Sequence, residues 1–278
     1  MRKLFSPRTY ASVAVVAGML VGFASPAAAQ FVPRSVGGSV FGEDYMIEGG
    51  FGFWSPNADM SISSESLGIK GDRIDFKRDL GLKDEATTTI TGIFHPGKKH
   101  KLRYEYLPLK YDQEATITRD ITFNGQKYTV GIPVTSAIDW RTHRFGYEYD
   151  FLKRNTWFAG VIVEAKYTDI AASLESPQVS RESAHAAAPV PEIGGAGRFY
   201  AMPNLAIGGE FVAFGLPSSL IENAEGHYFD LNLYGTYNFT NYIGAQVGYR
   251  RLDLGYVFED DNGSFLLRGL YFGVVARY

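Results

Sequence analysis

Cysteine is absent from this chain of 278 residues, which excludes disulfide bonds, thiol chemistry and a lipid-modified N-terminal cysteine. Positive charge is also scarce: 27 Lys and Arg residues stand against 30 Asp and Glu residues, and the net charge is −3 at pH 7. A nucleic-acid-binding domain needs a basic surface, so we expect no nucleic-acid partner. The clustered ligand spacing of a metal site is missing as well, so we expect neither a metal nor another cofactor.

The sequence also lacks any apolar run of the roughly 20 residues that a membrane-spanning helix needs. Its longest apolar stretch, residues 11–23, follows a basic start with Arg2, Lys3 and Arg8 and precedes the small residues Ala27–Ala29. This layout predicts a secretory signal peptide over residues 1–29. We then expect an N-terminal periplasmic segment over residues 30–43 and one folded domain over residues 44–278.

What the chain does contain is aromatic residues (15%) and 31 glycines, a mixture that favours strands and turns over helices. Apolar and polar residues alternate in ten segments, as they do in strands whose two faces meet different surroundings. Short turns alternate with long connections, and aromatics flank the apolar bands. The segments are 44–54, 87–95, 102–106, 144–151, 157–168, 192–201, 207–213, 229–239, 243–250 and 264–278.

A soluble β-sandwich would also alternate, but one-sided apolar bands with aromatic edges and unequal loop lengths are typical of membrane barrels. Inside a bilayer every backbone N–H and C=O must be paired within the protein, so the sheet must close. The pattern therefore predicts an all-β fold, a transmembrane antiparallel up-and-down β-barrel of ten strands, plus or minus two. We expect a monomer whose short turns face the periplasm.

The C-terminal octet, which begins at Tyr271, resembles the signal that the outer-membrane assembly machinery reads. Gly273, Ala276 and the terminal Tyr278 match its glycine, apolar and aromatic positions. Residues 44–278 as a whole resemble small bacterial outer-membrane barrels of the OmpA-like or porin-like class. The segments IDFKRDLGL, KLRYEYLPL and FGYEYDFL are similar to an uncharacterised subgroup of them. The resemblance implies location in the outer membrane and, as partners, outer-membrane lipids, lipopolysaccharide and the assembly machinery. It implies no activity.

If the apolar faces meet lipid, the polar faces of the same strands line the lumen. A barrel of about eight strands fills its interior with side chains, whereas 16 or more leave a water channel. Two interpretations stay open: charges that pair across the lumen and close it, or a narrow cation-leaning passage for small solutes. The predicted lumen-facing charges are Glu48, Arg103, Glu105, Arg144, Glu148, Asp150, Glu164, Lys166, Glu192, Arg198, Glu210, Asp230 and Arg250.

Catalysis, such as lipid hydrolysis, is a minor third hypothesis. It would need a histidine arranged with a nucleophile or a carboxylate. No such arrangement is evident among His95, His100, His143, His185 and His227. We therefore expect no enzyme and assign no catalytic residue.

Two surface features complete the sequence picture. The charged segment 70–85 carries Ile74, Phe76, Leu80 and Leu82, and it is either a plug over the barrel mouth or a solvated loop with a small apolar anchor. Outward-facing arginines at the outer rim, where they could meet lipid phosphates, cost little at an interface and need no function. These arginines are Arg141, Arg251 and Arg268.

Overall fold

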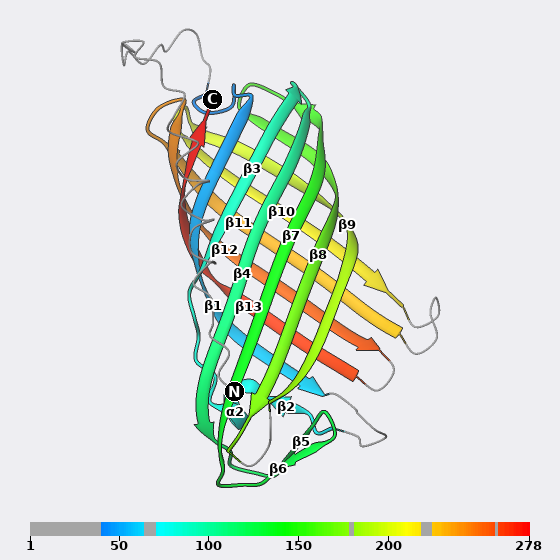
Figure 1. Ribbon diagram of the computed structural model, residues 1–278. Coiled ribbons are helices and arrows are strands. Elements are labelled where there is room, and N and C mark those ends of the chain that lie inside the picture. Colours follow the sequence, from blue (N-terminus) through cyan, green and yellow to red (C-terminus); the bar gives the residue numbers. More distant parts are fainter. Residues whose placement is uncertain (1–39, 64–70, 178–180, 218–223, 259–260) are drawn as a thin grey trace, which may run out of the picture. The chain divides into compact units, whose positions relative to one another are not determined.

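A computed structural model describes residues 40–63, 71–177, 181–217, 224–258 and 261–278, so the predicted signal peptide lies outside the described residues. Ten antiparallel strands form a closed barrel, as the alternation predicted (Figure 1). The last strand pairs with the first along its whole length, from Glu48 opposite Arg277 to Ser63 opposite Asn262. The wall strands are β1 (Ile47–Ser63), β3 (Thr87–Gly97), β4 (His100–Thr116), β7 (Pro133–Lys153), β8 (Trp157–Glu175), β9 (Glu182–Met202), β10 (Leu205–Leu216), β11 (Ala224–Asn238), β12 (Ile243–Phe258) and β13 (Asp261–Arg277).

The two ends of the barrel differ in their connections. Short turns join β3 to β4, β7 to β8, β9 to β10 and β11 to β12 at the end that holds the C-terminus, at the top of Figure 1. At the other end, two long connections carry further elements: β2 (Ile74–Asp75) with α2 (Phe76–Leu80), and β5 (Ile121–Phe123) with β6 (Gln126–Tyr128). No helix among the described residues is long and apolar enough to cross a membrane.

Large apolar side chains are exposed on the outer wall in the half of the barrel near the short turns. Phe51, Leu102, Leu233 and Phe272 are 44, 49, 50 and 61% exposed, which would be costly in water over so continuous a surface. A closed sheet with an apolar outer band is the arrangement that hydrocarbon requires. This half of the barrel is therefore the membrane-spanning part.

The apolar residues change face part-way along the strands. On β4, Leu102 and Tyr104 point outwards, whereas Leu107, Leu109 and Tyr111 point inwards and are at most 1% exposed. Neighbouring strand residues face opposite sides of the sheet. Because Tyr106 and Leu107 are adjacent and both apolar, the apolar positions move there from the outer face to the inner face. The same inversion places further side chains inside, including Trp140 of β7, Ile170 of β8, Leu252 of β12 and Phe265 of β13.

This inversion explains why the strands are longer than predicted. Segments 144–151 and 192–201 are parts of β7 and β9, which have 21 residues each. Beyond the belt the outer wall meets water and carries polar residues such as Asn57 and Asp59, while the interior becomes a hydrophobic core. The barrel thus combines a membrane half, apolar outside, with a projecting half that is packed like a soluble protein.

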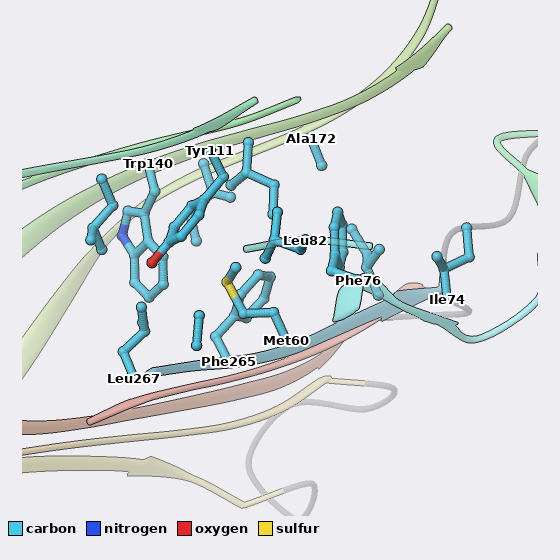
Figure 2. Packing of buried hydrophobic residues seen from close by; sticks show 14 of the residues in the cluster. Met60, Ile74, Phe76, Leu82, Tyr111, Trp140, Ala172, Phe265 and Leu267 are labelled. Carbon is cyan, nitrogen blue, oxygen red and sulfur yellow. The ribbon is translucent and has the colours of Figure 1, made fainter. Parts of the chain in front are cut away.

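The segment containing β2 and α2 enters the projecting half and completes its core. Ile74, Phe76, Leu80 and Leu82 are 2, 4, 1 and 6% exposed. Figure 2 shows Phe76 and Leu82 between side chains of the wall strands, among them Trp140 and Phe265. Each such burial stabilises the fold by about 1.5–3 kcal/mol. Of the two interpretations of this segment, the structure supports the plug.

The face change predicts opposite tolerance for charge along one strand. Val274→Arg places a guanidinium in the middle of the belt and should lower the free energy of unfolding by about 2–4 kcal/mol. Leu266 lies on the same outer face of β13, outside the belt on the lid side, opposite Asp59 and Asp253. Leu266→Arg should therefore lower the free energy of unfolding far less. Denaturant unfolding in lipid bilayers measures both; equal losses would contradict the placement of the belt.

Candidate functional site: a lumen lined with paired charges

All thirteen charges predicted for the lumen lie on the inner wall. Eleven of these residues are buried, and the other two, Arg103 and Glu210, are nearly so, with side chains 16 and 10% exposed. Because successive strand residues alternate between the faces, one correct assignment per strand places all its charged residues. The structure also shows which of these residues meet, which the sequence did not indicate.

A central network joins charges from opposite sides of the lumen. Arg250 of β12 lies 2.7 Å from Glu105 of β4 and 2.7 Å from Asp230 of β11. Arg144 of β7 lies 3.2 Å from the same Glu105 and 2.8 Å from Glu164 of β8. Since β4 and β12 are not neighbours in the sheet, the Arg250–Glu105 pair crosses the barrel interior, whereas the other three pairs join neighbouring strands. They satisfy charges that would be very costly if buried alone.

A second group lies closer to the short turns and includes a residue absent from the sequence prediction. Lys101 is 2.6 Å from Glu148 and 3.1 Å from Asp150. Arg103 is 2.5 Å from Glu148 and also pairs with Glu210. Lys101 was missed because the predicted strand began at residue 102, whereas β4 begins at His100. The alternation with Arg103 would have found it.

The end of the lumen beside the C-terminus is closed by a third group. Arg198 is 2.7 Å from Glu43, which also accepts a hydrogen bond from the hydroxyl of Tyr200. Arg277 pairs with Glu48 and donates to Asn238 at 2.8 Å. Sequence reasoning placed Glu43 in the periplasmic segment and did not include Arg277 among the lumen charges. Arg277 shares its face with Gly273, so its position could have been inferred.

The lumen leaves little open space among these charges. Two cavities, of about 80 and 60 Å³, lie between the charged side chains, enough for a few water molecules each. Glu192 is fully buried beside Lys166, 3.4 Å away, and its carboxylate has no hydrogen-bond partner among the described residues. The Lys166 ammonium lies 3.4 Å from the centre of the Tyr228 ring, a cation–π contact that partly replaces water.

The apolar core of the projecting half forms a second layer over the charges. The guanidinium of Arg250 lies 5.4 Å from the ring centre of Trp54, where the two layers meet. Further towards the lid, Trp140 and Phe265 pack edge to face, with ring centres 5.4 Å apart. Trp54, Trp140 and Phe265 are each 1% exposed. Two chemically different layers of side chains, one charged and one apolar, therefore fill the interior that the structure describes.

A lid made from the two long connections covers the apolar core. The β5–β6 hairpin turns at Asn124 and Gly125, both with positive φ, as tight hairpin turns require. Its Tyr128 donates a hydrogen bond to the carbonyl of Leu174 at 3.1 Å, and Asn124 donates to Glu182 at 3.0 Å. The hairpin is thereby fixed to β8 and β9.

Asp79 of α2 joins the two parts of the lid. Its carboxylate is 2.8 Å from Arg119, which follows β4, and 3.2 Å from Arg78, and it also accepts from the backbone N–H of Asp75. Burial by itself raises the pKa of Asp79, but the hydrogen bonds from Arg119 and Arg78 outweigh it and hold the pKa well below its usual value. Asp79 is therefore charged at any physiological pH.

Each of the five histidines contacts an aromatic or acidic residue from another segment of the chain. His185 lies 2.9 Å from Asp169, and His227 lies 3.5 Å from Asp253; these pairs are on the outer wall. Sequence reasoning missed both because the partners come from adjacent strands. Among the described residues, no hydrogen bond adds a serine or threonine to either pair. The others are His95 on Tyr45, His100 with Tyr147, and His143 with Tyr104.

No protein-family model and no curated protein matches the sequence. Among solved structures, the outer-membrane protease OmpT from Escherichia coli is similar, with a TM-score of 0.53 and 9% identity over 88% of this chain and 99% of that one. The fold is that of a bacterial outer-membrane β-barrel. With its apolar belt and its closed sheet, the chain is an integral outer-membrane protein.

A further similar structure is Ail, the attachment invasion locus protein of Yersinia pestis. Its TM-score is 0.36 and its identity 9%, over 84% of this chain and 99% of that one.

The residues of the predicted assembly signal lie at the end of β13 that carries the C-terminus. Tyr271 and Gly273 face the lumen, whereas Ala276 and Tyr278 face outwards, and Tyr278 is 82% exposed. The carbonyl of Tyr278 accepts hydrogen bonds from Met46 at 2.7 Å and Ile47 at 2.9 Å. Recognition of these residues by the assembly machinery stays a prediction.

The central network predicts a large effect from one substitution. Arg250→Met leaves Glu105 and Asp230 without their main partner and should lower the free energy of unfolding by about 3–5 kcal/mol, because buried charges would be left unpaired. Lys110→Met is the control, since Lys110 is exposed and its pair with Asp112 should contribute at most about 1 kcal/mol. Denaturant unfolding measures both. Similar losses would argue against a tightly coupled network.

The lid predicts a specific pH dependence. Because the pKa of Asp79 is lowered on folding, its contribution is complete above the ordinary carboxylate pKa of about 4 and is lost as pH falls through the lower folded value. The lid should therefore stay closed at about pH 5, whereas Asp79→Asn should open it at neutral pH. Hydrogen exchange of residues 71–86 measures this. Unchanged protection in Asp79→Asn, relative to an Asp112→Asn control, would contradict the role of Asp79.

Proposed function

We propose that this protein is a structural barrel with a closed lumen that presents a rigid surface outside the outer membrane for interactions. The observation that carries the proposal is the filling of the interior by paired charges in the membrane half and by an apolar core in the projecting half. An apolar core in the projecting half would obstruct the water path that a pore needs. The same core makes the part of the barrel beyond the lipid headgroups rigid.

The alternative is a narrow, cation-leaning channel for small solutes. Such a passage would need a continuous water path. The excess of acids over bases among the predicted lumen charges would favour cations in it. These acids, however, are paired with basic side chains, and three of the pairs cross the barrel: Glu105 with Arg250, Asp230 with Arg144 and Glu210 with Arg103. Beyond them lie Trp54, Trp140 and Phe265, each 1% exposed and part of the apolar core. These contacts favour the closed barrel.

A catalytic role, such as lipid hydrolysis, is the weaker candidate. The likeness to a protease at 9% identity concerns the fold alone. The two His–Asp pairs stand on the open outer wall, with histidine side chains 60 and 63% exposed, and the cavities lie elsewhere. We propose a non-catalytic monomer whose partners are outer-membrane lipids, lipopolysaccharide and, during biogenesis, the assembly machinery.

Conductance of the refolded full chain in planar bilayers tests the closure. We expect no channel from the wild type, and none from Arg250→Ala or from the pair Trp54→Ala and Trp140→Ala, because each change opens one layer only. Heat-modifiable migration on gels verifies that every variant is folded. A stable conductance from the wild type would favour the channel instead.

A further inference from the structure

Two arginines stand directly opposite each other on the outer wall. Arg251 of β12 and Arg268 of β13 are register partners, and both side chains lie on the outer face. Like charges directly opposite in an antiparallel pair destabilise the sheet. This position therefore carries an electrostatic cost that the fold itself does not explain.

Only one of the two arginines is balanced by an acid. Arg251 donates to Asp253 at 2.8 Å, but its Nε is buried without a hydrogen-bond partner. Arg268 is exposed and, among the described residues, has no ion pair; its other neighbour across the ladder is Asn57. Arg268 consequently presents guanidinium donors that no ion pair among the described residues occupies.

The arginine pair lies at the edge of the apolar belt that is nearer to the lid. The next outward positions towards the short turns are Tyr249 and Leu270, which are register partners and are 40 and 67% exposed. Val247 and Phe272 follow, again as partners, and each is 61% exposed. A cationic site thus sits directly over an apolar stripe, which complements an amphiphile with an anionic head and acyl chains.

We propose that Arg251 and Arg268 bind the phosphorylated headgroup of a lipid in the leaflet at the lid end, with its acyl chains along the stripe below. Two guanidinium groups match the several oxygens of a phosphomonoester, which arginine binds through paired, charge-assisted hydrogen bonds. The anion removes the repulsion between the arginines. The inference rests on the proposed membrane placement and gives the lipid partner of the proposed function a definite site.

Arg141 provides a matched control on the far side of the barrel. It also points outwards above the belt, but its ion pair with Asp139 at 3.1 Å balances it. Its register partners are Pro108 and Asp169, so no second arginine stands opposite. The proposal assigns no phosphate site to it.

The test uses the full chain refolded into nanodiscs of phosphatidylcholine, alone or with either phosphatidate or diacylglycerol, which lacks the phosphate. The thermal midpoint of unfolding should rise with phosphatidate and not with diacylglycerol, because a ligand of the folded state stabilises it. Arg268→Ala and Arg251→Ala should each weaken the apparent affinity for phosphatidate about tenfold. Arg141→Ala should respond like the wild type.

Arg268→Ala also has a signature that a merely structural arginine would not give. In phosphatidylcholine alone its midpoint should equal or exceed that of the wild type, because the substitution removes repulsion. A midpoint lowered equally in all three lipids, or a full phosphatidate response in both variants, would overturn the proposal. So would an equal rise with inorganic phosphate alone, which would indicate a free anion rather than a lipid. None of these readouts depends on conductance.

Discussion

The pairing of the backbone in hydrocarbon is the constraint on which the rest of this structure depends. No water is present there to satisfy an unpaired strand edge, so β13 must pair with β1, and every other feature of the membrane half follows from that closure. A closed sheet has an inside and an outside, and the two meet different media. Side chains that would form the core of a soluble protein face lipid, and the charges are left to fill the interior.

The constraint ends where the strands leave the membrane, and there the apolar residues of the sequence change from the outer to the inner face. Once the strands emerge from the lipid, the outer wall meets water and the interior can exclude it, so the favourable pattern reverses. On β4 the reversal occurs between Tyr106 and Leu107. The chain therefore needs no separate domain to project from the membrane. The wall strands other than β3 continue as the wall of a hydrophobic core, which residues 71–86 complete from within.

The two interiors have different consequences for function. Ion pairs across the lumen, such as Arg250 with Glu105, set which strands face one another and make the membrane half rigid. The apolar core beyond them is covered by the lid, whose two parts are joined by Asp79 and Arg119.

The sequence by itself determined the fold class, the ten strands and the inward face of all thirteen predicted charges, because a period of two is a local property that closure cannot alter. It did not determine strand length or the apolar core, since a one-residue shift such as that at Leu107 resembles the end of a strand. Only the tertiary structure decided the partners of Arg250, the inclusion of Lys101 and the facing of Arg251 by Arg268. These contacts depend on register between strands, which is set by the closure of the whole barrel and not by any one segment.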